Sequence, residues 1–420
     1  MRSDNLLRIL AGLLFVLPVL VSNGCGPSRP AARGSAPTES DFSATGTPPP
    51  IDVLSADPSD WVTETLEDMT LEEKVGQMIF VRAYGYFQND STPRMRRLFD
   101  LVGKKRVGGI CLFQGDIHTS ALLVNRLQER SKVPLLVAAD FEWGVAMRLR
   151  RSTRFPEAMA LGASRDTALA FEMGRTIGRE SRAIGIRQVY APVADVNNNP
   201  ANPVINIRSF GENPALVASM ASAFARGLQS EGVLATAKHF PGHGDTDVDS
   251  HLGLPFMRHS RGRMDSVELV PFRSLIRDGV GSVMVAHCDI PSLGGKTGVP
   301  ATLSTEAIDS LLLGAMGFRG LVVTDAMDMT GLTGNFGPDS AAVLAVEAGN
   351  DVLLLPEDVE AAMEGILAAV RNRRISPERI DRSVRKILAL KEWAGLHEAG
   401  PVDLAAASSV IAGKGSLRLA

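Results

Sequence analysis

Residues 233–251 read VLATAKHFPGHGDTDVDSH, and this stretch joins a buried strand to a polar loop. Its first five residues are small and mostly apolar, as is typical of a strand that is covered on both faces of a parallel sheet. The charged and hydrogen-bonding side chains begin at Lys238, where such a strand should end. Pro241 and Gly242 interrupt any helix after it, so we expect the polar residues to lie on a loop at the carboxyl end of the strand.

Short apolar runs of the same kind recur along the chain, and amphipathic stretches lie between most of them. The predicted strands are Val75–Val81, Gly109–Phe113, Leu135–Ala139, Val189–Val193, Val233–Ala237, Val283–Ala286, Leu321–Thr324 and Asp351–Leu355. The predicted helices are 116–131, 166–184, 214–231, 264–278, 304–316, 338–348, 359–373 and 377–393. A regular alternation of strand and helix is typical of an α/β fold with a parallel sheet.

Eight such strands predict a (β/α)8 TIM-type barrel over residues 56–395, as a single catalytic domain. A doubly wound open sheet is the alternative. That fold usually has a glycine-rich phosphate loop after its first strand, and residues 81–88 contain none. Residues 396–420 form a short C-terminal tail that could pack on the barrel or extend from it.

The first 25 residues have the features of a bacterial lipoprotein signal peptide. Arg2 and Arg8 flank an apolar run, Ile9–Val21, that is too short to span a bilayer comfortably. The run leads into SNGC at 22–25, which resembles a lipobox, although serine stands where leucine is usual. Residues 26–55 are rich in Pro, Ser and Ala and are predicted to be a disordered tether. We therefore expect an extracytoplasmic protein, periplasmic or at the cell surface, that is anchored to a bacterial membrane through lipidated Cys25.

The composition argues against several classes of partner. A net charge of −3 and an aromatic content of 5% favour neither nucleic acid nor an anionic membrane surface as a partner. Cys111 and Cys288 lie within apolar runs, so we expect small buried residues rather than a disulfide. We expect no cofactor, and we expect the protein to be a monomer.

Five of the predicted strands end in polar side chains, and in a barrel these ends meet at one mouth. The polar groups are Asp140, Asp195, Lys238 with His239, His287 with Asp289, and Asp325. Asp325 is the strongest candidate for a catalytic residue, because it directly follows the predicted strand Leu321–Thr324. An aspartate here could instead cap the next helix. Together with the other strand ends, it indicates a catalytic carboxylate.

His251 is the candidate for proton transfer, because the unperturbed pKa of histidine lies near neutrality. Asp249, two residues earlier, could orient and tune its ring. A metal site is the alternative use of His239, His243 and His251, but the loop cannot place two rings on one helical face, so we expect no metal. We expect His243 to hydrogen-bond within the loop. The histidines expected to be ordinary surface or helix-end residues are His118, His259 and His397.

The run Lys238–Thr246, continued by Asp249-Ser250-His251, resembles the signature of family 3 glycoside hydrolases, in particular the β-N-acetylglucosaminidase branch. RSFG at 208–211 and TDAM at 324–327 occur in that family's order, and the resemblance covers residues 60–395. It implies a retaining exo-β-N-acetylhexosaminidase that acts on peptidoglycan- or chitin-derived glycans.

The resemblance also implies a role for each matching residue. Asp325 would be the nucleophile that forms a covalent glycosyl-enzyme, and His251, paired with Asp249, would be the acid/base. The residues that would hold the sugar hydroxyls are Asp140, Arg148, Arg208, Lys238 and His239.

Two departures from the family pattern stand out. Trp143 replaces the first glycine of the usual Asp-x-Glu-Gly-Gly, which could re-line the edge of the pocket. Many relatives also carry a second α/β sandwich domain, and we expect this chain to function without one. The alternatives are a β-glucosidase or β-xylosidase of the same family, a non-catalytic glycan-binding lipoprotein, and a metal-dependent barrel hydrolase.

Overall fold

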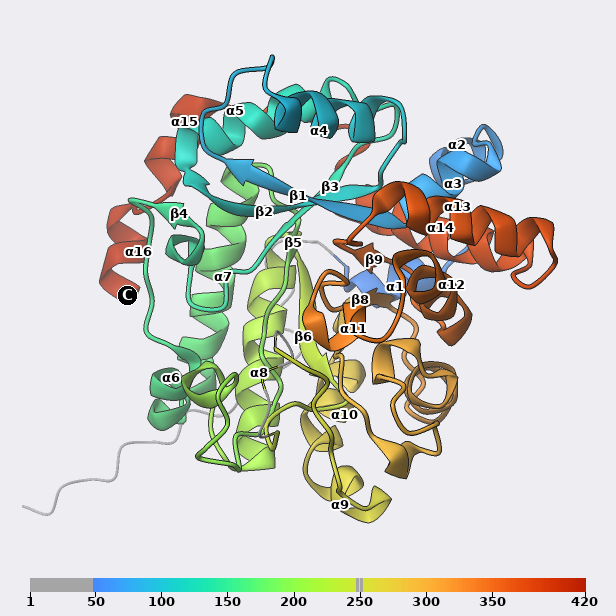
Figure 1. The fold of residues 1–420 in the computed structure, drawn as a ribbon. Helices are drawn as coiled ribbons and strands as arrows, with labels where there is room; N and C mark the ends of the chain where they lie inside the picture. The colour runs from blue at the N-terminus through green and yellow to red at the C-terminus, as the bar shows by residue number, and fades with distance from the viewer. Residues whose placement is uncertain (1–47, 247–248, 250–251) are drawn as a thin grey trace, which may run out of the picture. The chain divides into compact units, whose positions relative to one another are not determined.

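A computed structural model describes residues 48–246, 249 and 252–420, and these residues build a parallel barrel surrounded by helices (Figure 1). The strands are β1 (Ile79–Gly85), β2 (Gly109–Asp116), β3 (Leu136–Ala139), β4 (Leu149–Arg150), β5 (Gln188–Val189), β6 (Leu234–Phe240), β7 (Ser282–Val285), β8 (Leu321–Thr324) and β9 (Leu353–Leu354). Their spatial order is β8-β7-β6-β5-β3-β2-β1-β9, and the short β4 pairs with β2 outside this path.

The barrel is closed between β8 and β9. Val323 and Val352 form a parallel bridge, and the amide of Thr324 donates to the Val352 carbonyl oxygen at 3.0 Å. All of the strand pairs in the described chain are parallel, as a helical crossover between consecutive strands requires. The predicted (β/α)8 barrel is therefore confirmed.

The helices cover the outside of the barrel. They are α1 (Pro50–Ser55), α2 (Asp60–Glu67), α3 (Leu71–Gln77), α4 (Pro93–Gly103), α5 (Ile117–Gln128), α6 (Ala158–Ser164), α7 (Thr167–Ala183), α8 (Pro214–Ser230), α9 (Arg261–Ser266), α10 (Leu269–Arg277), the π-helix Glu306–Ala315, α11 (Thr330–Thr333), α12 (Pro338–Ala348), α13 (Val359–Arg371), α14 (Pro377–Trp393), α15 (Leu404–Val410) and α16 (Lys414–Leu419). Helices α7 and α8 pack closely at Gly174, where a Cβ atom would lie only 2.2 Å from the Phe224 carbonyl oxygen.

Most helix starts agree with the capping residues in the sequence. The Asp166 side chain accepts hydrogen bonds from two amides at the start of α7, and Asn213 does the same for α8, where Pro214 is the first helical residue. Hydrogen bonds between each capping side chain and the amides that follow it thus set where α7 and α8 begin.

The first predicted strand is wrong over its N-terminal half. Thr70 and Glu73 form a reciprocal capping box that starts α3 at Leu71, and the strand begins only at Ile79. The apolar residues Leu71, Val75 and Met78 are spaced for one face of a helix. The apolar residues at 75–78 therefore belong to this helical face and its end, and not to a buried strand.

Two predicted helices also differ from the structure. The helix predicted at 264–278 is divided into α9 and α10, with the break at Val267, whose backbone is not helical. The helix predicted at 304–316 has π-helical hydrogen bonding from Glu306 to Ala315.

The predicted tether, residues 26–55, ends too late in the sequence, because its last residues belong to the barrel domain. Residues 50–55 form α1, and Pro50 is buried against the barrel next to Gly281. The indole nitrogen of Trp393 donates to the Pro48 carbonyl oxygen at 2.7 Å. The burial of Pro50 and the hydrogen bond from Trp393 attach this segment to the barrel, so residues from Pro48 on belong with the barrel domain. The signal peptide and the rest of the predicted tether lie outside the described residues.

The C-terminal tail packs on the barrel. The Asn125 side chain exchanges two hydrogen bonds with the backbone of Val402, and the amide of Ala412 donates to the Thr153 hydroxyl. Helices α15 and α16 therefore lie against α5 and α7.

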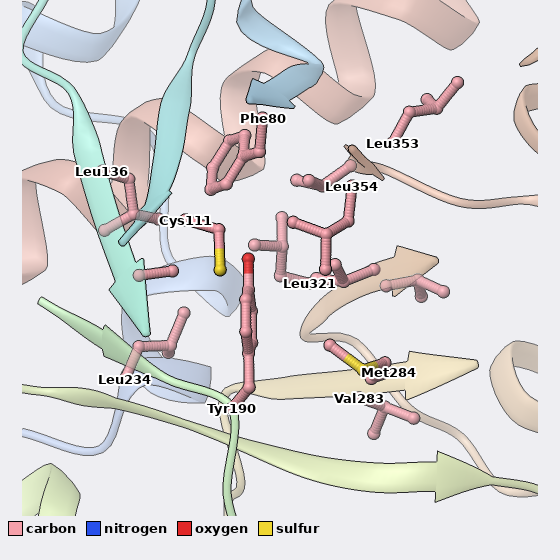
Figure 2. Packing of buried hydrophobic residues seen from close by; sticks show 14 of the residues in the cluster. Phe80, Cys111, Leu136, Tyr190, Leu234, Val283, Met284, Leu321, Leu353 and Leu354 are labelled. Atoms are coloured by element: carbon pink, nitrogen blue, oxygen red, sulfur yellow. The ribbon is translucent and has the colours of Figure 1, made fainter. Parts of the chain in front are cut away.

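Apolar side chains from the strands fill the interior of the barrel. Figure 2 shows Tyr190 extending across this interior with its hydroxyl toward Cys111, between side chains from opposite strands. Cys111 and Cys288 are both buried and free, as expected. Within the described residues, no helix has the length and apolar character needed to cross a bilayer.

Candidate active site

A cavity of about 300 Å³ opens at the carboxyl ends of the strands. Asp140 follows β3, Lys238 and His239 lie near the carboxyl end of β6, and Asp325 follows β8. All four side chains line this cavity, which we refer to as the catalytic cavity. Arg148 and Arg208 line it as well. The structure therefore brings together six of the eight residues predicted for the site.

Lys238 is the centre of a buried charge cluster. Its ammonium group lies 2.9 Å from Asp140 Oδ1 and 2.8 Å from Glu142 Oε1. Arg148 pairs with the other oxygen of Asp140, and Arg208 forms two hydrogen bonds to Glu142, at 2.7 and 2.9 Å. Each carboxylate is thus shared between the lysine and one arginine, a geometry that fixes both in place.

The cluster keeps its carboxylates ionised. Burial on its own would raise the pKa of Asp140 and of Glu142, but the charges of Lys238 and the arginines hold both below their ordinary values. Conversely, the two carboxylates raise the pKa of Lys238 against the effect of its burial. The site therefore offers fixed acceptors and fixed donors side by side, which suits the hydroxyl groups of a sugar.

His239 is oriented by a carboxylate from the neighbouring strand end. Its Nδ1 lies 2.7 Å from Oδ2 of Asp195, and its amide donates to the same oxygen at 3.1 Å. The other oxygen of Asp195 accepts from the amide of His243 at 2.6 Å. These contacts leave Nε2 of His239 facing the cavity, 3.5 Å from the Arg208 guanidinium.

Asp325 is half-buried in the wall of the cavity. Its amide donates to the Val285 carbonyl oxygen at 2.9 Å, and its Oδ1 accepts from the amide of Ala326 at 2.8 Å. Burial would raise the pKa of Asp325, but the neighbouring His239 and His287 and this amide bring it below the ordinary value. The side chain is therefore a carboxylate at neutral pH, the form that a nucleophile needs.

His287 braces the peptide that follows Asp325. It is fully buried, and its Nε2 lies 3.0 Å from the Ala326 carbonyl oxygen. On the other side of the ring, Nδ1 lies 2.8 Å from the Thr302 hydroxyl, which in turn contacts the Ala286 carbonyl oxygen. The ring thus fixes the turn that aims Asp325 into the cavity.

The acid/base candidate His251 lies outside the described residues. Its predicted partner Asp249 is among the described residues, and the Asp249 carbonyl oxygen accepts hydrogen bonds from the amides of Leu252 and Gly253. Asp249 is not among the described residues that line the catalytic cavity.

Both limbs of the loop that carries Asp249 are anchored. His243 is buried, and its Nδ1 lies 2.6 Å from the Thr246 hydroxyl, so the predicted hydrogen bond within the loop is confirmed. Burial lowers the pKa of His243, which favours the neutral ring. His259, which is predicted to be an ordinary surface residue, keeps 23% of its side-chain surface exposed, and its Nε2 lies 2.7 Å from Oδ2 of Asp245. The sequence does not predict this pairing, because the two residues meet only in the fold.

Trp143 does not line the catalytic cavity. It packs partly buried against the core, with the Arg154 guanidinium 4.8 Å from its ring centre. The sequence places Asp195 and His287 at the mouth but assigns them no role, and the structure shows that they hold His239 and the peptide after Asp325. The site residues that the sequence analysis does not identify are Glu142 and the ion pair of Arg82 with Asp328.

The part of the chain that the structure describes contains no cluster of three or more His, Cys, Asp or Glu side chains arranged to hold a metal ion.

Residues 70–390 match the Glycosyl hydrolase family 3 N terminal domain. The chain is 35% identical over 326 residues to Beta-hexosaminidase A from Pseudoalteromonas piscicida, covering 70% of this chain and 54% of that protein. It is 33% identical over 360 residues to the Beta-N-acetylglucosaminidase/beta-glucosidase of Cellulomonas fimi, covering 84% of this chain and 63% of that protein.

Among solved structures, the family 3 β-N-acetylglucosaminidase from Paenibacillus sp. str. FPU-7 superposes with a TM-score of 0.75 at 42% identity, covering 80% of this chain and 64% of that chain. The chain thus spans between about half and two thirds of the length of these three relatives.

Proposed function

Because this chain belongs to glycosyl hydrolase family 3, we propose that it is a retaining exo-β-N-acetylhexosaminidase that releases terminal β-linked N-acetylglucosamine. The observation that carries the proposal is the ionised Asp325 beside the Lys238 charge cluster, in a cavity of about 300 Å³. That volume suits one sugar ring, as an exo-acting enzyme requires. The names of the relatives from Pseudoalteromonas piscicida and Paenibacillus support the N-acetylated substrate.

In the proposed mechanism, the Asp325 carboxylate attacks the anomeric carbon while the bond to the leaving oxygen breaks. A covalent glycosyl-aspartate forms, and water then attacks the same carbon, so the configuration is retained. A carboxylate whose pKa is already lowered is ready to attack and is also a good leaving group in the second step.

The proton for the leaving oxygen would come from His251, with Asp249 favouring its charged form. The same imidazole, then neutral, would take a proton from the attacking water. The contacts of His243 with Thr246 and of His259 with Asp245 hold the described residues on either side of this segment.

The charge cluster would bind the terminal sugar. Asp140 and Glu142 can accept hydrogen bonds from hydroxyl groups, and Arg148, Arg208 and Lys238 can donate to hydroxyl oxygens. The imidazole of His239 offers one more polar contact from the floor of the cavity. Because the partners already hold each other, little conformational entropy is lost when the sugar binds.

A substrate comparison tests the proposal. Hydrolysis of p-nitrophenyl β-N-acetylglucosaminide should exceed hydrolysis of the corresponding glucoside and xyloside, and the Asp325→Ala variant should hydrolyse none of them. Preference for the glucoside would favour the β-glucosidase alternative. The name of the Cellulomonas fimi relative includes beta-glucosidase as well as Beta-N-acetylglucosaminidase. Tight sugar binding without hydrolysis by the unaltered protein would favour the glycan-binding alternative.

We further propose that the protein is a monomer outside the cytoplasm, attached to a membrane through lipidated Cys25, and acts on peptidoglycan- or chitin-derived glycans. A Cys25→Ala variant should move from the membrane fraction to the soluble fraction. Release of N-acetylglucosamine from purified muropeptides and from chitobiose, measured in parallel, would distinguish the two glycan sources.

A further inference from the structure

A second cavity, of about 350 Å³, lies beside the catalytic cavity at the same end of the barrel. It is bounded by the end of β1, by α4, and by the segment between β9 and α13, and we refer to it as the outer cavity. The two cavities share Arg82, Asp328 and Leu355. The outer cavity therefore adjoins the catalytic cavity.

The partition between the cavities is an exposed ion pair. Arg82 and Asp328 lie 2.9 Å apart, and their side chains retain 36% and 29% of their accessible surface. The Arg82 guanidinium is supported from below by the ring of Phe113, at 4.7 Å from the ring centre. A substrate that fills the catalytic cavity and extends past this pair would reach the outer cavity.

The outer cavity has an apolar floor and a polar rim. The buried Val81 and Leu98 contribute to the floor, while the exposed Arg94, on α4, and Glu357, after β9, contribute to the rim. The Arg94 guanidinium lies 4.3 Å from the ring centre of Tyr84, which holds the arginine over the cavity. No ion pair among the described residues uses Arg94 or Glu357, whereas Arg97 on the same helix is paired with Glu360.

This combination matches the chemistry of a pyranose ring. A sugar presents an apolar C–H face together with hydroxyl groups that both donate and accept hydrogen bonds. Glu357 can accept from a hydroxyl group, Arg94 can donate to one, and the apolar floor can contact the C–H face. A purely apolar ligand would form no hydrogen bond with either charged group.

We propose that the outer cavity is the subsite for the leaving-group sugar, with Arg94 and Glu357 as its binding residues. The inference rests on the proposed function, because it assumes that the catalytic cavity holds the terminal N-acetylglucosamine. It assigns the second sugar ring of the substrate to the groove between α4 and α13, next to the Arg82–Asp328 pair.

The test compares two substrates that differ only in the second ring. Chitobiose and methyl β-N-acetylglucosaminide carry the same terminal sugar and an alkyl-type leaving oxygen, so the ratio of their kcat/KM values measures the contribution of the outer cavity. Arg94→Met and Glu357→Gln should each lower kcat/KM for chitobiose by about tenfold, the loss of roughly one hydrogen bond to a charged group. The value for the methyl glycoside should stay within about twofold.

Arg96→Met is the matched control, since Arg96 is an exposed residue of α4 that does not line the outer cavity. Its ratio should equal that of the unaltered protein. The subsite would be overturned if both Arg94→Met and Glu357→Gln left the ratio of kcat/KM values unchanged, or if each variant lowered kcat/KM equally on the two substrates. If the unaltered protein hydrolysed neither substrate, the proposed function would be overturned, and the subsite with it.

Discussion

Replacing Lys238 by methionine should destabilise the protein strongly, because it removes the cation that two buried carboxylates share. The Lys238 side chain is 3% exposed, and its ammonium group lies 2.9 Å from Asp140 and 2.8 Å from Glu142. Breaking a buried ion pair by removing one partner costs about 3–5 kcal/mol, mostly because a buried charge is left without its partner. Asp140 keeps Arg148 and Glu142 keeps Arg208, so the low end of that range, about 3 kcal/mol, is expected.

The assay is urea denaturation at pH 7, with the free energy of unfolding as the readout. Lys74→Met is the matched control: Lys74 pairs with Asp381 at 2.8 Å, but the two side chains are 17% and 33% exposed. An ion pair near the surface contributes about 0–1 kcal/mol. The Lys238→Met loss should therefore exceed the control loss by about 2 kcal/mol.

The sign of the pH dependence follows from the pKa directions. In the unaltered protein, the pKa values of Asp140 and Glu142 are below their ordinary values. Their stabilising effect is therefore fully present above the unfolded-state pKa of about 4 and is lost as the pH falls through the folded-state values. Without Lys238 those carboxylates protonate at a higher pH than in the unaltered protein, so the difference in stability between the two proteins should narrow as the pH falls toward the folded-state pKa values of the unaltered protein. A Lys238→Met loss no larger than that of Lys74→Met, or a difference independent of pH, would refute the reasoning.

The remaining predictions concern the chemistry. Asp325→Ala should abolish hydrolysis while leaving sugar binding measurable by calorimetry, and a labelled intermediate on another carboxylate would contradict the assignment. His251→Ala should lose about 10²–10⁴-fold in kcat/KM on substrates with poor leaving groups and much less on good ones; equal losses would argue against the acid role. His287→Leu should lower kcat more than it changes KM and reduce the free energy of unfolding by about 1–3 kcal/mol, because the Ala326 carbonyl oxygen loses its donor. His287→Gln, whose amide can still donate, should recover part of kcat, and two equally impaired variants would show that this hydrogen bond does not matter.

The sequence alone determined the barrel and the positions of most of its polar strand ends. The reason is local: a strand buried on both faces needs a continuous apolar run, and the side chain after its last residue emerges at the mouth. Asp140, Lys238, His239 and Asp325 could be identified in this way, and the family motif added Arg148 and Arg208. The same local reasoning failed at residues 71–78, where a helical spacing of apolar residues also reads as a buried run.

Only the tertiary structure decided which polar groups meet. Arg208 reaches Glu142 across 66 residues, and His239 meets Asp195 across 44, distances in sequence that no periodicity encodes. The outer cavity likewise exists only because the end of β1 lies beside the segment after β9 when the barrel closes. Strand and helix periods are properties of neighbouring residues, whereas ion pairs and cavities depend on how distant segments pack, and that packing is set by the closure of the barrel.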